Sequence, residues 1–261
     1  MDLGLNGKRV LVAAASKGLG RAIAQEFVHE GARVAICSRE QATIDRVAQE
    51  IGGGTLGIAA DVSTDAGCRR FIETASAALG GIDILIVNAG GPAPGRFDDL
   101  DDAAWQKAID LTLFSAVRLT RFALPELRKA KGSIVFSTST SVRQPTQYLN
   151  LILSNAIRSA VHGMLKTLSG DLAKEGIRVN AVQPGRIITD RIIELDTVAA
   201  RRDGITVDAV RERYERTVIP LGRYGTPEEF AAAVVFVASP RASYITGVSL
   251  QVDGGMLMSL F

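Results

Sequence analysis

Short apolar runs rich in valine and isoleucine alternate along the chain with longer stretches of helical periodicity. The apolar runs cover residues 10–15, 34–37, 82–87, 133–138, 177–182 and 248–252. Because these runs are continuous rather than alternating, we expect strands buried on both faces, as in a parallel sheet covered by helices. Helices are predicted between them, over 18–30, 41–51, 64–79, 101–130, 150–174 and 227–238. The pattern therefore predicts an α/β fold with a doubly wound, three-layer parallel sheet.

One segment departs from this rhythm. Residues 190–223 are polar, arginine-rich and interrupted by Gly204. Because open α/β sheets bind ligands at the carboxyl ends of their strands, we interpret this segment as a lid over a substrate site; a solvated excursion without a role is the alternative. No repeat or linker divides the 261 residues, so we expect a single domain over 1–261.

Composition argues against several classes of protein. Thirty basic and 28 acidic residues are interspersed and give a net charge of +2, which favours neither nucleic acid nor a membrane surface as partner. No apolar run reaches the roughly 18 residues of a membrane span, and we expect a cytoplasmic protein. Two cysteines and two histidines are too few for a disulfide framework or a metal site. Cys37 lies in an apolar run, where a buried, inert thiol is expected.

The loop after the first strand predicts a nucleotide site. It reads AASKGLG over residues 14–20 and leads into a helix, whose N–H groups and dipole attract a phosphate. At the end of the second strand, Ser38 and Arg39 stand where an NAD-binding chain has a carboxylate. Arg39, with Lys17 in the neighbouring loop, favours the 2′-phosphate of NADP(H). Two incidental surface cations are the alternative interpretation.

In its motifs the chain resembles the short-chain dehydrogenase/reductase family, in the group that includes 3-oxoacyl-carrier-protein reductases. The likeness covers essentially the whole chain and rests on ASKGLG (15–20), Asp61-Val62, Asn88-Ala89-Gly90, GSIV (132–135) leading into Ser139, IRVNAVQPG (177–185) followed by Thr189, and YITGVSLQVDGG (244–255). The resemblance implies a Rossmann fold with strand order 3-2-1-4-5-6-7. It also implies a homo-oligomer, a dimer or tetramer, paired through the helices that begin near residues 101 and 150.

The same resemblance assigns cofactor-binding positions. They are Ala14, Ser16, Lys17, Gly18, Leu19 and Gly20 in the first loop, Ser38 and Arg39, Asp61 and Val62 at the adenine, Asn88, Ala89 and Gly90 at the ribose, Arg158, and Pro184, Gly185, Ile187 and Thr189 at the nicotinamide. The family's first loop glycine falls on Ala14. We expect its methyl group to cost about 1–2 kcal/mol if φ is positive there.

The reaction centre departs from the family. Members transfer a hydride between nicotinamide and a carbonyl or alcohol carbon, with a tyrosine as acid/base and a lysine four residues later. Alignment on Gly163 places the tyrosine position at Ser154 and the lysine position at Arg158. The spacing of four keeps both side chains on one helix face. A serine hydroxyl is a poor acid, and an arginine with a pKa above 12 cannot relay a proton at neutral pH.

The other catalytic positions are also altered or uncertain. The relay asparagine of the family falls on Thr112, and its serine on Ser139, with Ser141 as a near rival. Tyr148 lies in a loop before Ser154 and is a candidate substitute acid, although a packing role is the expectation. Bulk water or an acidic group of the substrate are the other sources of the proton.

Three functions are compatible with these residues. We expect an NADP(H)-dependent oxidoreductase for a small carbonyl or hydroxy compound, with altered proton handling. The alternatives are a dinucleotide-binding sensor or subunit with little turnover, and a different reaction such as dehydration or isomerisation. The arginines of the lid, Arg201, Arg202, Arg211, Arg213 and Arg216, permit an anionic substrate but are also typical of a solvated face.

Overall fold

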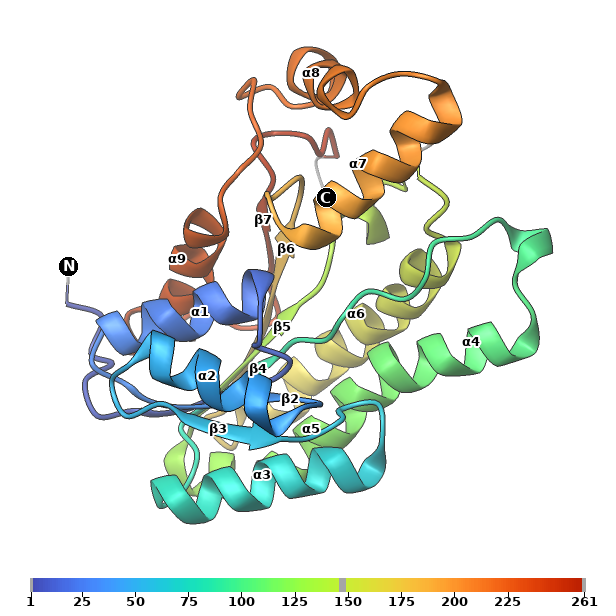
Figure 1. Ribbon diagram of the computed structural model, residues 1–261. Helices are drawn as coiled ribbons and strands as arrows, with labels where there is room; N and C mark the ends of the chain where they lie inside the picture. Colours follow the sequence, from blue (N-terminus) through green and yellow to red (C-terminus); the bar gives the residue numbers. More distant parts are fainter. Residues whose placement is uncertain (1, 146–148, 260–261) are drawn as a thin grey trace.

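A seven-stranded parallel sheet forms the centre of the molecule (Figure 1). The computed structural model describes residues 2–145 and 149–259. Its strands are β1 (Arg9–Val12), β2 (Arg33–Ser38), β3 (Leu56–Ala59), β4 (Ile84–Val87), β5 (Ser133–Ser137), β6 (Arg178–Pro184) and β7 (Ser249–Val252). They lie in the order β3-β2-β1-β4-β5-β6-β7, which confirms the predicted fold. The order reverses at β1, between β2 and β4, and such a reversal opens a crevice at the carboxyl ends of the strands.

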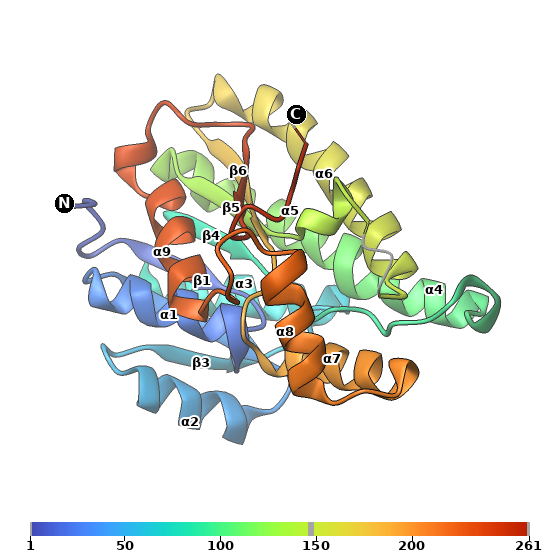
Figure 2. The same ribbon diagram turned by 90° about the horizontal axis from the view of Figure 1, so that it is seen from above.

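Helices cover both faces of the sheet (Figures 1 and 2). One face carries α1 (Gly18–His29), α2 (Gln41–Ile51) and α9 (Pro227–Ala238), and the other carries α3 (Asp65–Leu79), α5 (Ser115–Ala130) and α6 (Ile152–Ala173). Each face has its own apolar core: Phe27 and Phe230 are buried on the first side, and Phe71 and Phe136 on the second. Burial on both sides explains the continuous apolar sequences of β1, β2, β4, β5 and β6. The edge strand β7 differs from the expectation, because none of its residues is buried.

The helix ends follow local sequence signals. Thr226 and Glu229 form a capping box at the start of α9, with Pro227 in its first turn. The predicted helix over 101–130 is helical from Asp102 to Ala130, but it contains a π-helical turn, Ile109–Phe114, between α4 (Asp102–Ala108) and α5. Such turns often lie at functional sites, and hydrophobic periodicity alone does not predict them.

Residues 190–223 fold mainly as two helices above the carboxyl edge of the sheet (Figures 1 and 2). They are α7 (Asp190–Asp203) and α8 (Val207–Thr217), separated by Gly204 at φ +66°. A buried polar cluster beneath them joins Arg186, which follows β6, to Asp196 of α7. The Arg186 guanidinium lies 3.7 Å from the ring centre of Tyr214 in α8. These contacts attach both helices to the sheet edge.

Within the described residues, no helix is long and apolar enough to cross a membrane, and no cluster of His, Cys, Asp and Glu could hold a metal ion. Cys37 and Cys68 are buried free thiols. Burial raises the pKa of each to about 12, so neither forms a thiolate at neutral pH. The burial predicted for Cys37 is confirmed.

Candidate active site

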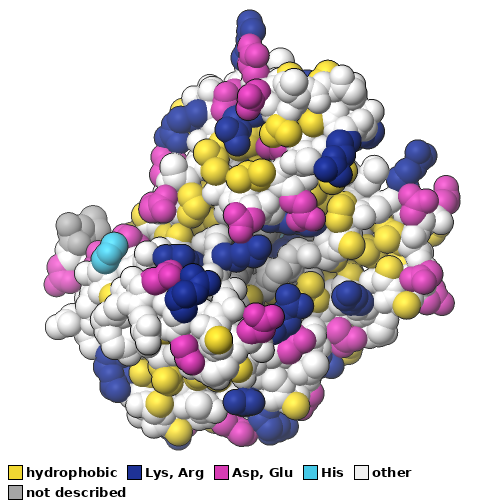
Figure 3. Space-filling view, in the orientation of Figure 1, with side chains coloured by type: hydrophobic (Ala, Val, Ile, Leu, Met, Phe, Trp, Pro, Cys, Tyr) yellow, Lys and Arg dark blue, Asp and Glu magenta, His cyan; other side chains and the backbone are white. Residues whose placement is uncertain are grey.

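A cavity of about 980 Å³ lies at the carboxyl edge of the sheet, between the strand ends and the helices α7 and α8. Figure 3 shows the corresponding hollow, with basic side chains around it. Each cofactor-binding residue predicted from the sequence lines this cavity, as do Ser139, Ser141 and Ser154. Parallel strands bring their carboxyl ends to one edge, and for this reason motifs far apart in the sequence meet here.

The loop between β1 and α1 has the geometry of a phosphate cradle. Ala14 has φ +50° and Gly18 φ +57°. The amide of Asn88 donates to the carbonyls of Ala13 and Ala14, at 3.1 Å each, and holds the loop in place. A Cβ at Gly20 would lie 2.6 Å from the Ala14 oxygen, so only glycine fits there. The first-turn N–H groups of α1 have no helical acceptor and are suited to an anion.

Ala14 has the positive φ for which the sequence analysis expected a cost. An L-residue in this region pays roughly 1 kcal/mol or more that glycine does not.

Two of the cations that line the cavity are Arg39, which follows β2, and Lys17, in the loop before α1. Arg39 is exposed and makes no ion pair or side-chain hydrogen bond among the described residues. Lys17 instead pairs with Asp190 of α7, with Nζ and Oδ2 3.3 Å apart and both side chains over 70% exposed (73% and 71%). An exposed pair of this kind contributes little, so Lys17 can be recruited by an anion. No sequence pattern indicated the contact with Asp190.

The middle of the cavity has room for an extended ligand. A Cβ added to Gly90 would meet no atom within 4 Å, so the backbone after β4 borders open space. Asp61 Oδ1 accepts hydrogen bonds from the backbone N–H and the hydroxyl of Ser63, at 3.0 and 2.8 Å. Thr189 caps α7 by accepting from the N–H of Ile192 at 3.4 Å. A dinucleotide fits this combination of an amide-rich loop and an open, polar edge.

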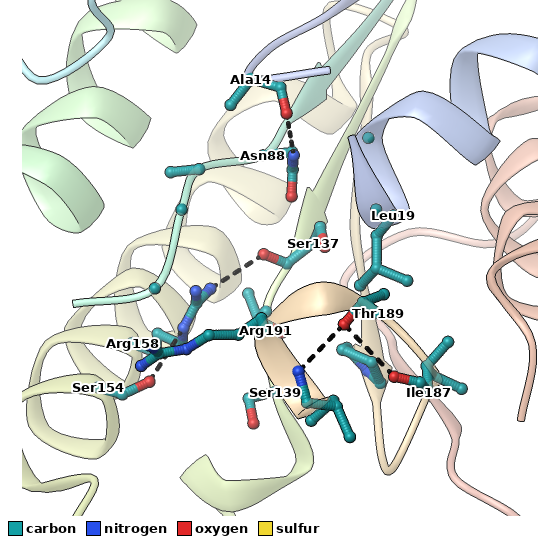
Figure 4. A pocket seen from close by; sticks show the side chains of 18 of the residues that line it. Ala14, Leu19, Asn88, Ser137, Ser139, Ser154, Arg158, Ile187, Thr189 and Arg191 are labelled. Carbon is teal, nitrogen blue, oxygen red and sulfur yellow. Dashed lines mark hydrogen bonds between the residues drawn. The ribbon is translucent and has the colours of Figure 1, made fainter. Parts of the chain in front are cut away.

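Ser154 and Arg158 come together as their spacing predicted (Figure 4). Arg158 Nε donates to Ser154 Oγ at 3.2 Å, and Arg158 Nη1 donates to the carbonyl of Ser137 at 3.2 Å. Burial, and then the charge of Arg191, lower the pKa of Arg158 to about 10. The guanidinium therefore stays charged at neutral pH and cannot exchange a proton with a substrate.

The two candidate serines share one hydrogen bond. Ser139 and Ser141 place their hydroxyl oxygens 2.8 Å apart, and both residues line the cavity. Thr112 lies elsewhere: it is buried in the π-helical turn, is not among the cavity-lining residues, and its hydroxyl has no hydrogen-bond partner in the described part of the chain. Its relay role stays a prediction. Tyr148 lies outside the described residues.

Arg191 is a cavity residue that sequence reasoning missed. It extends from the first turn of α7 toward Arg158 (Figure 4). Its Nη2 donates to the carbonyl of Pro92 at 2.8 Å, and its Nη1 pairs with Glu194 at 3.1 Å. The only signal in the sequence was its place two residues after Thr189; Arg191 was not among the arginines considered for an anionic substrate.

His162 was also missed as part of this region. It projects from α6 behind the cavity wall, with Nε2 2.9 Å from the hydroxyl of Thr138 and Nδ1 3.3 Å from that of Ser249. Burial, followed by the charges of Arg143 and Arg158, lowers the pKa of His162 to about 4. The imidazole is therefore neutral at pH 7 and acts as a hydrogen-bonding strut between α6 and the strand ends.

Comparison with known proteins gives a consistent picture. A family model described as enoyl-(acyl carrier protein) reductase matches residues 13–257. An uncharacterized oxidoreductase, YvrD, of Bacillus subtilis is 35% identical over the full length of both chains. The L-sorbose reductase of Gluconobacter frateurii, solved with NADPH and L-sorbose, superposes with a TM-score of 0.93 at 32% identity, covering all of both chains. A 7α-hydroxysteroid dehydrogenase, solved with NADH and 7-oxo glycochenodeoxycholic acid, gives 0.86 at 29% identity, covering 100% of this chain and 98% of that one.

Proposed function

The chain belongs to the short-chain dehydrogenase/reductase family, and from this we propose that it uses NADP(H) to interconvert a carbonyl and a hydroxyl group on a small molecule. The observation that carries the proposal is the single cavity lined by every predicted cofactor residue. Within the family we place it near the 3-oxoacyl-carrier-protein reductases, in a subgroup that has Ser154 and Arg158 instead of tyrosine and lysine.

The preference for NADP(H) rests on the end of β2. Arg39 is exposed and lines the cavity. Positions 38 and 39 hold a serine and an arginine, so neither has a carboxylate that would repel a 2′-phosphate. Its planar guanidinium can pair with a phosphate and stack on an adenine, and Lys17 adds a second cation. L-sorbose reductase, which was solved with NADPH, supports this choice, whereas the relative solved with NADH shows that related chains take either cofactor. Titration should therefore give tighter binding of NADPH than NADH; equal affinities would contradict the preference.

At the proposed reaction centre, each residue has a separate role. When bound, the nicotinamide supplies or accepts the hydride. Ser139 or Ser141 donates a hydrogen bond to the reacting oxygen, and Arg158 stabilises negative charge on that oxygen through its positive field. Ser154 helps to orient Arg158. None of these groups delivers a proton at pH 7, so the proton comes from water that enters the partly open cavity.

We further propose that residues 190–223 act as a lid within a single-domain subunit, and that subunits pair through α4 and α6. The lid proposal is supported by the position of α7 and α8 above the cavity. Pairing is supported only by family analogy, and sedimentation of the purified protein tests it.

A second candidate function is NADP(H) binding with little or no turnover, as in a sensor or regulatory subunit. It is favoured by Ser154, whose hydroxyl accepts a hydrogen bond from a permanent cation where the family has its acid. The two candidates separate in one experiment. Nicotinamide absorbance is followed with NADPH and NADP⁺ across a panel of ketones, aldehydes and alcohols. Turnover of any substrate supports the oxidoreductase, and tight NADPH binding without turnover supports the sensor.

A further inference from the structure

The reactive end of the cavity carries two arginines that come from different elements. Arg158 projects from α6, and Arg191 projects from α7 toward it (Figure 4). The oxygens bound by Arg158 are neutral: the Ser154 hydroxyl and the Ser137 carbonyl, both at 3.2 Å. The charge of Arg191 is near enough to disfavour the protonated form of Arg158.

Within the described residues, the positive charge of these two arginines is only partly balanced by ion pairs. Among the ion pairs of the described residues, none includes Arg158. Arg191 has one carboxylate partner, Glu194, whose side chain is 62% exposed. Solvent screens so exposed a pair, and it does little to neutralise the cavity. A cation partly withdrawn from water without a partner is costly, and a bound anion would remove that cost.

Guanidinium groups select a particular class of anion. Their planar fork of N–H groups matches the two oxygens of a carboxylate, and such charge-assisted bonds are about twice as strong as neutral ones. Arg158 lies beside Ser154 and, through the Ser137 carbonyl, beside the strand end that carries Ser139. A carboxylate held there would place an adjacent carbonyl within reach of the serine hydroxyls.

We propose that the substrate is a 2-oxo acid, reduced to the 2-hydroxy acid, whose carboxylate is held between Arg158 and Arg191. The proposal rests on the proposed function. In the reaction C2 gains the hydride from NADPH and its oxygen gains a proton from water, so the ketone is reduced as NADPH is oxidised to NADP⁺. The carboxylate also makes the neighbouring carbonyl electron-poor when its charge is neutralised by the two cations, which reduces the need for a strong acid.

The first test compares 4-phenyl-2-oxobutanoate with its ethyl ester and with 4-phenylbutan-2-one, using the wild-type protein and NADPH. We expect kcat/KM for the acid to exceed that for the ester by about 10- to 100-fold, which is the range for hydrogen bonds to charged groups. Arg191→Gln should remove most of this advantage, mainly through KM for the acid. Arg201→Gln is the matched control, because it removes the same charge from α7 at a position that does not line the cavity.

A binding measurement separates this inference from the proposed function. Calorimetry with 4-phenylbutanoate and 4-phenylbutanamide, each added to the NADP⁺ complex, needs no turnover. Tighter binding of the acid, lost in Arg191→Gln, supports the anion site even if no ketone is reduced. Equal affinities for the acid and the amide would overturn the anion site. Equal turnover of the acid and the ester would also overturn it, but would still support the proposed oxidoreductase. If Arg191→Gln weakens NADP⁺ binding and leaves the preference for the acid unchanged, Arg191 binds the cofactor phosphates and the inference is wrong.

Discussion

Placing an acid at residue 154 is the most direct test of the proposed reaction centre. Ser154→Tyr with Arg158→Lys puts a phenol and an ammonium at positions four residues apart on α6, where the native side chains already meet at 3.2 Å. Both positions line the cavity, and Ser154 is partly exposed to it, so an aromatic ring extends into open volume rather than into the core. The change therefore alters the proton-handling groups with little cost in packing.

The expected gain follows from the pKa of a phenol. An unperturbed tyrosine has a pKa of about 10, and an opposite charge within about 4–6 Å lowers a neighbouring pKa by roughly 1–3 units. The phenol would then titrate between about 7 and 9 and serve as a general acid at neutral pH. General acid catalysis contributes typically 10²–10⁴-fold. We expect kcat/KM for a neutral ketone to rise at least about 10²-fold, equivalent to about 2.7 kcal/mol of barrier.

The assay follows NADPH consumption with 4-phenylbutan-2-one over a range of pH. Reduction needs the protonated phenol, so the rate of the double variant should fall as pH rises through about 7–9, whereas the wild type should lack this limb. Ser154→Phe with Arg158→Lys is the matched control, since it has the ring without the hydroxyl. An equal gain in the phenylalanine variant, or no gain despite retained NADPH binding, would refute the reasoning.

Three further predictions concern stability. Ala14→Gly relieves a positive φ and should raise the melting temperature by about 1–3 °C. Lys131→Gly is the control, because Lys131 has the same φ of +50° far from the cavity, and it should raise the melting temperature by a similar amount. A lower melting temperature in Ala14→Gly alone would contradict this. Burial lowers the pKa of His162 to about 4, so the wild-type free energy of unfolding should fall as pH drops from about 6.5 toward 4. Denaturant titration of His162→Gln should show a weaker dependence of the free energy of unfolding on pH. Asp196→Asn leaves the buried guanidinium of Arg186 without its counter-charge and should lower the free energy of unfolding by about 3 kcal/mol, measured by denaturant titration. A loss below about 1 kcal/mol would argue against this pair as the anchor of α7 and α8.

The fold was predictable because its signals are local and repeated. Valine- and isoleucine-rich runs covered on both faces read as parallel strands, and a threonine before Pro227 marked the start of a helix. The π-helical turn between α4 and α5 was not predictable, because hydrophobic periodicity indicates a helix but does not distinguish a π turn from an α turn. Lys131 in the left-handed region likewise has no signature in the sequence.

The parts of the cavity lining that directly follow a strand could be predicted from the sequence. The first loop, the end of β2 and the segment after β6 each fall at the carboxyl edge by topology alone, and the cavity there is lined by all of them. Contacts between elements were not predictable: the approach of Arg191 to Arg158 and the pairing of Lys17 with Asp190 depend on how α7 packs over the sheet. Sequence spacing constrains side chains within one helix but not between helices.

Ser154, Arg158 and the nearby Arg191 have one electrostatic consequence in common. Arg158 keeps its proton, because a pKa of about 10 remains well above neutral, and Ser154 offers only a weakly acidic hydroxyl. Ser154 and Arg158 can therefore hold negative charge but cannot supply a proton. The double substitution adds an acid at residue 154 and keeps a cation at residue 158, whereas Arg191→Gln removes a cation from the proposed carboxylate site. Ser154→Tyr with Arg158→Lys should raise turnover of neutral ketones, and Arg191→Gln should lower turnover of 2-oxo acids alone. If the two effects are separate, the triple variant should prefer the neutral ketone to the acid, with both changes adding in free energy; strong non-additivity would mean that Arg191 also controls the protonation of the phenol.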